Sequence, residues 1–267
     1  MSLFKEKNWR IVGFNAENLF VYLDESPSED LSTMTEEAWQ KLSKSTVRNK
    51  SITSLREIAR MIQDLDPDFI LLCEIGGTES LENFSRYFLS DLYAPFLVEG
   101  NSNRGIDVGF LVKRSLPLRY ELVSHKNRPL EFLYPHEKQS LETGYESEAL
   151  AKTVSNGHRF SRDVVELRCY DARAHESSRP EFVLMSVHLK SPLDQERIDP
   201  EGRDRRRAEL EMLMRIYDEV AAEFSTEPND VPILIGGDFN GVVFGEWQGA
   251  EFERLRASDL RCCLELA

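Results

Sequence analysis

The sequence has few of the features that mark disulfide-linked, zinc-binding or membrane-spanning proteins. Its 267 residues include four cysteines, and no two of them form a CxxC pair, so neither a disulfide framework nor a zinc site is expected. No apolar run reaches about 18 residues, and the first ten residues contain no apolar signal core. We therefore expect a reduced, cytoplasmic protein with no transmembrane segment.

Positive charge is also scarce. The chain has 33 Lys and Arg against 47 Asp and Glu, which gives a formal net charge of -14 at pH 7. Such a chain gains nothing from bulk attraction to nucleic acid or anionic lipid, so strong non-specific nucleic-acid binding is not expected. A polyanionic substrate would have to be held locally, by a metal ion and a few arginines. The length and the lack of low-complexity stretches predict a single domain over residues 1–267.

Short apolar runs alternate with helical patterns along the chain. One helical pattern has apolar side chains at a three-to-four-residue spacing, and Asp66-Pro67 ends it. Its apolar positions are Val47, Ile52, Leu55, Ile58, Ile62 and Leu65. Residues 204–224 form a second helical pattern. Because several predicted strands follow one another without a helix between them, the pattern favours a layered α/β sandwich over a doubly wound sheet. The predicted strands are 9–14, 69–73, 108–112, 164–170, 182–187 and 231–235.

Two stretches read as loops. Residues 24–37 carry six acidic side chains among Ser, Thr and Pro, and residues 124–160 are polar and irregular. A loop of the second length is uncommon in a compact domain. It is either a substrate-facing insertion or a plain surface excursion.

Polar side chains follow four of the predicted strands. Asn15 follows IVGF, Glu74 follows FILLC, His188 follows FVLMSV, and Asp238 and Asn240 follow VPILIGG. Ligand sites in layered α/β folds usually lie at such strand ends. Taken singly, GGDFNG fits a turn, Glu74 a solvated strand end, and His188 a structural histidine. Their combination in one chain favours a site.

The chemistry of this set is that of a divalent-metal phosphoesterase. Mg²⁺ prefers oxygen ligands and keeps several waters, so one or two carboxylates suffice, and Glu74 is the best protein ligand. Asp238 is suited to orienting or deprotonating a water. Asn15, Asn240 and His188 are suited to donating hydrogen bonds to the phosphate oxygens as charge develops on them. The oxygen-rich set favours Mg²⁺ or Mn²⁺.

Six short segments resemble the endonuclease/exonuclease/phosphatase superfamily, which includes pancreatic deoxyribonuclease, apurinic endonucleases, neutral sphingomyelinases and inositol polyphosphate 5-phosphatases. They occur in the family order and span residues 9–241. The segments are FNAENLF at 14–20, ILLCE at 70–74, RGIDVGFLVK at 104–113, FSRDVVELR at 160–168, SVHLKS at 186–191 and GGDFNG at 236–241.

The resemblance implies a four-layered α/β/β/α sandwich of the deoxyribonuclease type. It implies that Glu74, with Asn15, belongs to the metal site, and that His188, Asp238 and Asn240 are catalytic, with Asp238 activating the water. The substrate implied is a phosphate ester: a nucleic acid, a phospholipid headgroup or a small ester.

Three further residues are assigned to the substrate by the same resemblance. Arg162 matches an arginine that contacts the substrate phosphate in the deoxyribonuclease branch. Asp107 matches a residue near the site in bacterial members, where it would orient His188. Lys190 matches a lysine of the HLKS segment and is read either as a phosphate contact or as a solvated surface lysine.

One departure from the family concerns a C-terminal histidine. Family members end with a segment that carries an Asp-His pair, but the five histidines here are 125, 136, 158, 175 and 188, and only 27 residues follow Asn240. We expect a sequence that stops short of the closing strands. The alternatives are a site completed by another histidine, such as His158, or by a second chain, and a non-catalytic relative that acts as a binding module.

The arginines of residues 203–207, RDRRR, open the predicted helix at 204–224. They either line the rim of the site and attract phosphate, or form a solvated helix face paired with Glu209 and Glu211. The second interpretation is favoured.

Overall fold

The computed structural model describes most of the chain, and the described residues divide into two compact units. The described residues are 7–43, 45–144, 147–175, 179–193, 197–225 and 231–263. Unit 1 comprises Met1–His125, Arg162–Val187 and Val231–Asp238. Unit 2 comprises Lys126–Ser161, His188–Asp230 and Phe239–Ala267. The single domain expected from the length stays a prediction.

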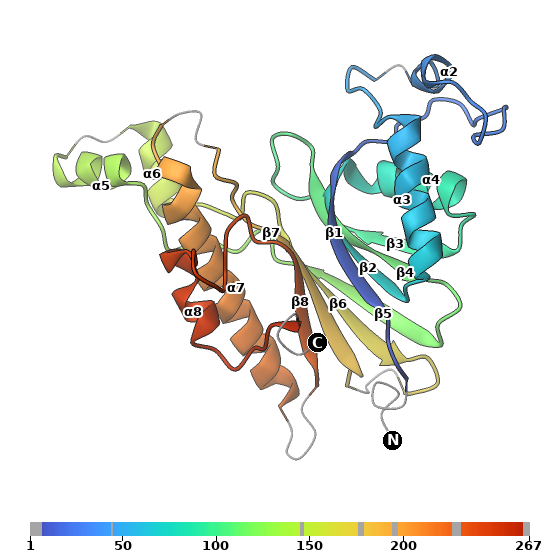
Figure 1. The fold of residues 1–267 in the computed structure, drawn as a ribbon. Coiled ribbons are helices and arrows are strands. Elements are labelled where there is room, and N and C mark those ends of the chain that lie inside the picture. The colour runs from blue at the N-terminus through green and yellow to red at the C-terminus, as the bar shows by residue number, and fades with distance from the viewer. Residues whose placement is uncertain are drawn as a thin grey trace. The chain divides into compact units, whose positions relative to one another are not determined.

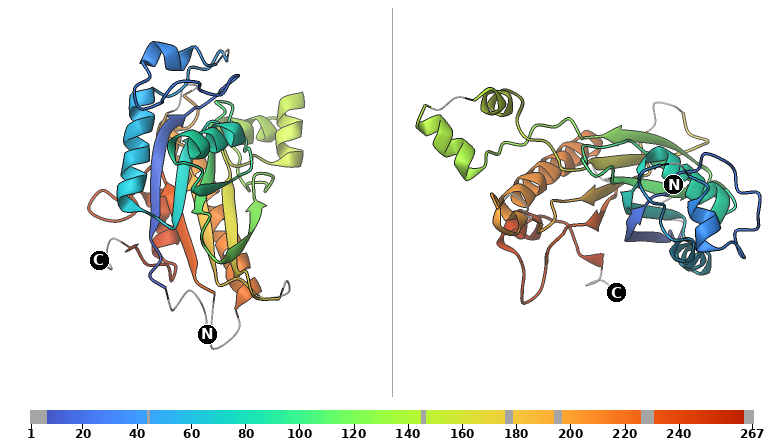
Figure 2. Two further views of the ribbon diagram at one scale, coloured as in Figure 1. Left: turned by 90° about the vertical axis from the view of Figure 1, so that its right-hand side faces the viewer. Right: turned by 90° about the horizontal axis from the view of Figure 1, so that it is seen from above.

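The first sheet of unit 1 has the order β1-β2-β4-β3, with β1 parallel to β2 and the other neighbours antiparallel. Helices α3 (Ile52–Leu65) and α4 (Gly77–Phe88) cover one face of this sheet, as Figures 1 and 2 show. Leu55 and Ile62 of α3 pack there against Ile70 and Leu72. The strands are β1 (Ile11–Leu19), β2 (Phe69–Ile75), β3 (Tyr93–Leu97) and β4 (Asp107–Lys113).

The second sheet packs against the opposite face of the first. Side chains alternate along each strand, so Phe69 and Cys73 of β2 face Leu167 and Phe182 of the second sheet in one buried cluster. The predicted α/β sandwich is therefore confirmed. The order is β5-β6-β7-β8, and the strands are β5 (Leu118–Ser124), β6 (Val164–Asp171), β7 (Phe182–His188) and β8 (Ile233–Asp238).

Unit 2 is built around the long helix α7 (Arg203–Phe224). Its first turn is capped by Asp199, whose carboxylate accepts the backbone N–H groups of Asp204 at 2.9 Å and Arg205 at 3.0 Å. The other helical segments of this unit are α5 (Pro135–Glu142), α6 (Glu148–Asn156), η1 (Pro200–Gly202), η2 (Ala250–Phe252) and α8 (Glu253–Arg256).

The structure corrects several predicted boundaries. The helix predicted from Val47 begins only at Ile52, because the Ser51 side chain accepts the Ser54 N–H and caps it; Val47 is exposed. Strands β3 and β5, the short helix α2 (Glu36–Gln40) and α4 were not predicted. The stretch 124–160 contains α5 and α6 rather than loop alone; α5 has few apolar residues to mark it, and α6 is only nine residues long.

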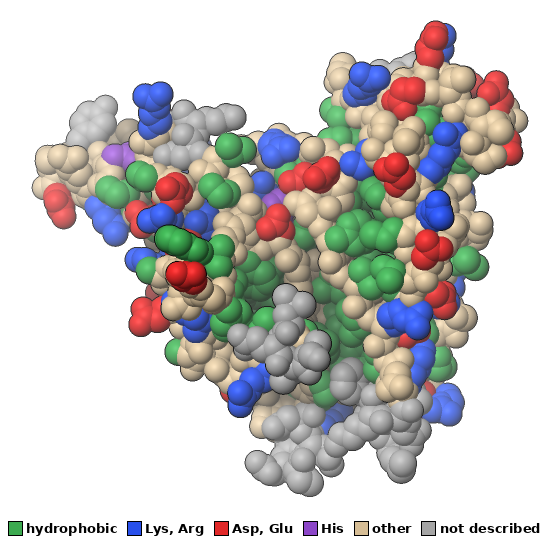
Figure 3. Space-filling model, in the orientation of Figure 1, with side chains coloured by type: hydrophobic (Ala, Val, Ile, Leu, Met, Phe, Trp, Pro, Cys, Tyr) green, Lys and Arg blue, Asp and Glu red, His purple; other side chains and the backbone are tan. Residues whose placement is uncertain are grey.

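No described helix is long and apolar enough to cross a membrane. Acidic and basic side chains are interspersed on the face drawn in Figure 3, with no single basic field.

Gly237 allows β8 to approach β7 closely. Its φ of 135° lies in a region open almost only to glycine, and a Cβ at this position would lie 2.0 Å from the Val187 carbonyl oxygen. The close packing of β8 against β7 therefore requires a glycine at position 237 of the GGDFNG segment. It sets the position of Asp238, the next residue.

We predict that Gly237→Ala destabilises the protein by more than about 2 kcal/mol, because the backbone strain and the collision with Val187 act together. The matched control is Gly144→Ala, where φ is 70° and no atom lies within 4 Å of the added Cβ. Its expected cost is about 1 kcal/mol. Urea unfolding of the three proteins measures both values, and equal costs for the two variants would contradict the packing argument.

Candidate active site

Asn15 and Glu74 lie within strands rather than after them, which corrects the prediction that both follow strand ends. Strand β1 continues to Leu19 and β2 to Ile75. Both ladders that involve β2 change register around Glu74, and Glu74 itself has a φ of 61°. A bulge of this kind turns a side chain away from the regular alternation of the strand. It is the local cause of the half-exposed position of Glu74 in an otherwise buried strand.

Asn15 and Asp238 are joined directly although 223 residues separate them. The Asn15 Nδ2 donates to Asp238 Oδ2 at 3.0 Å, and the Asn15 Oδ1 accepts the Glu17 N–H at 2.9 Å. Asn15 pairs with Cys73 in the β1–β2 ladder, so Glu74 follows the residue opposite it. Three residues from separate motifs thus come together in unit 1: Asn15, Glu74 and Asp238.

Cys73 lies at the centre of this group. Its Sγ donates to the Val187 carbonyl at 3.2 Å. Burial, helped by the negative charges of Asp238 and Glu74, raises the pKa of the Cys73 thiol to about 12, although a backbone hydrogen bond at Asp238 and the charge of Arg162 act to lower it. A thiol in this environment stays protonated at neutral pH, so Cys73 is a packing residue and not a nucleophile.

Arg162 and Asp107 hold the loop that follows β3. Asp107 Oδ1 accepts the Gly100 N–H at 2.7 Å, and the Arg162 carbonyl accepts the Asn101 N–H at 3.1 Å. A Cβ on Gly100 would approach both residues, at 3.0 Å from the Arg162 oxygen and 3.2 Å from Asp107 Oδ1. The structure therefore brings these two predicted substrate residues together. The predicted orienting of His188 by Asp107 stays a prediction.

His188, Lys190 and Asn240 belong to unit 2. His188 is the last residue of β7 and is buried, and the Asn240 Nδ2 donates to the Leu189 carbonyl at 2.9 Å. Asn240 is left-handed with a φ of 52°, a conformation that asparagine tolerates better than most residues. The HLKS and GDFN segments are thereby joined. The Lys190 Nζ bonds to the Ser191 and Leu193 carbonyls at 3.0 and 2.5 Å, so it is held by its own loop.

Glu209 of α7 supports this segment and was not singled out as a site residue. Its carboxylate is fully buried and accepts the backbone N–H groups of Lys190 at 2.6 Å and Ser161 at 2.7 Å. In the sequence, Glu209 looks like a solvent-facing acid in a charged helix. The one feature of the sequence that could have indicated its burial is its position beside Leu210, on the apolar side of the helix.

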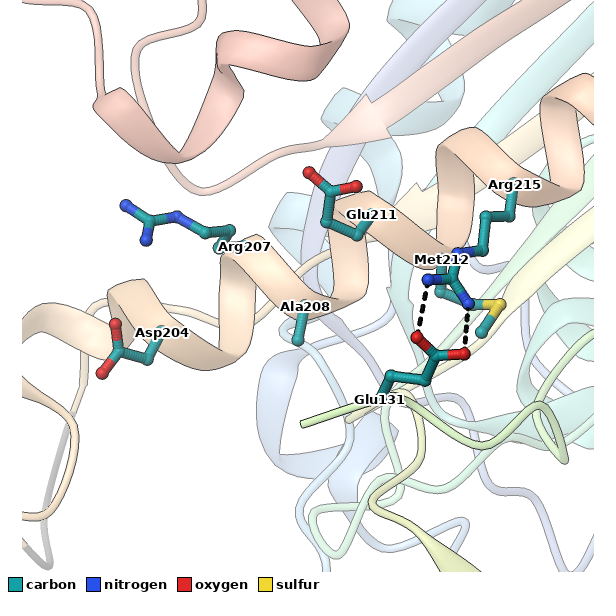
Figure 4. Close-up of a pocket in the computed structure, with 7 residues that line it drawn as sticks. All are labelled: Glu131, Asp204, Arg207, Ala208, Glu211, Met212 and Arg215. Carbon is teal, nitrogen blue, oxygen red and sulfur yellow. Dashed lines mark hydrogen bonds and ion pairs between the residues drawn. The ribbon is translucent and has the colours of Figure 1, made fainter. Parts of the chain in front are cut away.

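The arginines of residues 203–207 have different partners and different degrees of burial. Arg205 pairs with Glu209 as predicted, but Arg206 is buried and bonds to Glu251 at 2.6 Å, so the solvated face was wrong for Arg206. The predicted partner Glu211 pairs instead with Arg254. Figure 4 shows Arg207 pointing away from the pair that Arg215 forms with Glu131.

His158, the histidine named as a possible substitute for the family's C-terminal one, is engaged within the insertion. Its Nε2 lies 2.9 Å and 3.1 Å from the two carboxylate oxygens of Glu137. It also packs edge-on against Tyr134. This pairing gives His158 a structural role.

The described residues contain no cluster of three or more His, Cys, Asp or Glu side chains arranged for a metal. Mg²⁺ does not require one, because it keeps several waters and binds through one or two carboxylates plus substrate oxygens. The donor set of unit 1 is all oxygen: the carboxylates of Glu74 and Asp238 and the amide of Asn15. These residues fit a hard divalent cation.

No protein-family model and no curated protein sequence matches this chain. Several solved structures do match it in fold, with low sequence identity. TDP2 from Caenorhabditis elegans matches at 17% identity over 70% of this chain, with a TM-score of 0.41. The human Nocturnin catalytic domain matches at 15% over 77%, with a TM-score of 0.45.

An endonuclease/exonuclease/phosphatase family protein from Bacteroides thetaiotaomicron matches at 12% identity over 75% of this chain, with a TM-score of 0.43. Matches at this level of identity show a likeness of fold. The match spans 42% of the C. elegans protein, 62% of the Nocturnin domain and 58% of the Bacteroides protein.

A buried polar network follows Arg162 in the sequence. Asp163 accepts the His125 N–H at 3.0 Å, and His125 Nε2 lies 3.0 Å from Glu166. Burial raises the pKa of Asp163 from 3.8 to about 6, against the opposing hydrogen bond from Ser124 and the charge of His125. Burial also acts to raise the pKa of Glu166, but the bonds from His125 and Arg168 outweigh it and lower that pKa.

We predict that Asp163 makes the protein less stable as the pH rises through about 6. Its folded pKa lies above its unfolded value, so the folded state binds the proton more tightly. The stabilisation is complete below pH 3.8 and is lost by pH 7, at a cost of about 3 kcal/mol. Urea unfolding at pH 4 and pH 7 measures this change, and Asp163→Asn removes it.

The matched control is Asp171→Asn. Hydrogen bonds from Arg173 lower the pKa of Asp171, so its contribution is lost on acidification and has the opposite sign. Identical pH dependence in wild type and Asp163→Asn would contradict the assignment.

Proposed function

We propose that this protein is a metal-dependent phosphoesterase that hydrolyses a phosphate ester by attack of an activated water. The observation that carries the proposal is the Asn15–Asp238 hydrogen bond at 3.0 Å, beside Glu74 on the bulge of β2. If these residues belonged to unrelated turns and strand ends, their side chains would not be expected to lie together in the fold. The motif resemblance supports the same reaction class.

Asp238 is proposed to orient the water and accept its proton. The Asn15 amide donates to one of its oxygens, so the carboxylate is held in one orientation. A carboxylate held in this way is already oriented to accept a proton, so no rotational freedom has to be lost when the reaction begins. Asn15 of strand β1 thus orients the last residue of β8.

Glu74 is proposed as the principal ligand of Mg²⁺ or Mn²⁺, with Asn15 beside it. When bound, the cation would supply charge stabilisation for the phosphate oxygens. Arg162, His188, Asn240 and Lys190 are proposed to contact those oxygens, with Asp107 at the edge of the site. These roles come from the motif resemblance.

The substrate class is proposed from charge. With a net charge of -14 the chain does not favour a general polyanion. A nucleic-acid end, a phospholipid headgroup or a small phosphate ester would each present one reacting phosphate to the site. The substrate is therefore expected to be selected by local contacts and not by a long charged groove.

We predict that Asp238→Asn lowers the Mg²⁺-dependent hydrolysis rate by about 10²–10⁴-fold, because it removes the proton acceptor and keeps the shape. Rates are measured with bis(p-nitrophenyl) phosphate and with p-nitrophenyl phosphate, which separates diester from monoester activity. Glu74→Gln is expected to raise the Mg²⁺ concentration needed for half-maximal rate.

The matched control is Asp171→Asn. Asp171 ends β6 next to Leu118, at the opposite end of the sheet from Val187 and Gly237, so its loss leaves the rate unchanged. A folded Asp238→Asn protein with the wild-type rate would refute the role of Asp238. A wild type that hydrolyses neither ester with Mg²⁺ would refute the hydrolase proposal and favour a binding module.

A further inference from the structure

The bulge in β1 lies directly opposite Glu74. Asn15 pairs with Cys73, and the next pair along the ladder is Leu19 with Ile75. Three residues of β1, numbers 16–18, therefore lie opposite the single residue Glu74 of β2. Such an insertion leaves backbone groups outside the ladder and free to bond elsewhere.

The backbone of this bulge is left-handed at two successive residues that are not glycine. Glu17 has a φ of 49° and Asn18 a φ of 60°. This conformation is uncommon for residues with a side chain, although asparagine adopts it more readily than most. Non-glycine residues in this region mark places where surrounding contacts impose the conformation.

The two left-handed residues direct their amides at two residues of the proposed site. The Glu17 N–H donates to Asn15 Oδ1 at 2.9 Å, and the Asn18 N–H donates to Glu74 Oε2 at 3.1 Å. Successive amides of one short segment therefore orient both the amide that holds Asp238 and the carboxylate proposed to bind the cation. Bonds from a backbone N–H to a carboxylate are charge-assisted and directional.

Asn18 is itself held from a second element. Its Oδ1 accepts a bond from Arg104 Nη2 at 2.9 Å, and Arg104 precedes β4 in the loop that ends at Asp107. On the other side, the Lys50 Nζ donates to the Glu17 carbonyl at 2.9 Å. The bulge is thus tied at both of its left-handed residues, by side chains from two different loops.

We infer that Asn18 is a positioning residue that fixes the Glu74 carboxylate through its backbone N–H, and that Arg104 locks Asn18 in the conformation this requires. Neither residue touches the reacting atoms in this role. The inference rests on the proposed function for the identity of the cation, while the hydrogen bonds themselves do not depend on it. It adds two residues from FNAENLF and RGIDVGFLVK to the residues that act on the site.

The test measures cation affinity and not turnover. Mn²⁺ is titrated into the purified protein, and the free ion is followed by its electron paramagnetic resonance signal. Asn18→Val disfavours the left-handed backbone and is expected to weaken Mn²⁺ binding by about 10–100-fold, the usual effect of removing a partner that orients a ligand. Asn18→Gly keeps the backbone and the N–H, so it is expected to retain most of the affinity.

Arg104→Gln gives a second measurement that places no strain on the bulge. It is expected to weaken Mn²⁺ binding in the same direction and by a smaller factor than Asn18→Val. Ser90→Val is the matched control, because Ser90 is also left-handed, with a φ of 53°, and lies in the turn between α4 and β3. Its Mn²⁺ affinity is expected to equal that of the wild type.

The outcomes separate this inference from the proposed function. If Glu74→Gln weakens Mn²⁺ binding while Asn18→Val and Arg104→Gln bind as the wild type does, the positioning role is overturned and the metal assignment stands. If Glu74→Gln and the wild type bind equally, or if the wild type binds no Mn²⁺, both are overturned. Equal losses in Asn18→Val and Asn18→Gly would also overturn the backbone argument.

Discussion

The close meeting of the two sheets at one end of unit 1 is the constraint on which the proposed site depends. The Cys73 thiol reaches the Val187 carbonyl at 3.2 Å, and the same carbonyl excludes any side chain at Gly237. These contacts bring β2, β7 and β8 together where two of the polar motif residues lie. A wider separation of the sheets at this point would leave Asn15 out of reach of Asp238.

Regular strand geometry gives way to irregular geometry at some of the residues proposed for the site. Glu74 and Asn240 are left-handed, and β1 and β2 are both interrupted by bulges. Elsewhere in the same strands the alternation is strict, with Phe69 and Leu71 turned to one face and Ile70 and Leu72 to the other. The buried sandwich thus holds an irregular segment in place.

Buried carboxylates have a structural use in this protein as well as a proposed catalytic one. Glu209 is fully buried because it accepts two backbone N–H groups, and Glu251 because it pairs with Arg206. Each satisfies a donor that would otherwise be costly to bury. A buried acid in this chain is therefore not by itself a sign of catalysis. What distinguishes Asp238 and Glu74 is that both remain half-exposed.

The amino-acid sequence by itself determined the strands of the sandwich core and the residues that carry the proposed chemistry. Apolar runs such as 69–73 and 182–187 are continuous and only five or six residues long, which favours a buried strand over a helix, and the motifs could be read in order along the chain. The helices at 135–142 and 148–156 were not predicted because they are only eight and nine residues long, and the first buries no side chain.

Only the tertiary structure decided how those residues are aimed. The left-handed bulge opposite Glu74, the tie from Arg104 to Asn18 and the burial of Glu209 all depend on partners dozens of residues away. The local sequence sets only a preference for each backbone conformation, whereas the position of a bulge depends on the neighbouring strand with which it pairs. A carboxylate is fixed by whichever amide that strand brings within reach, which is why the orientation of the site appears only in three dimensions.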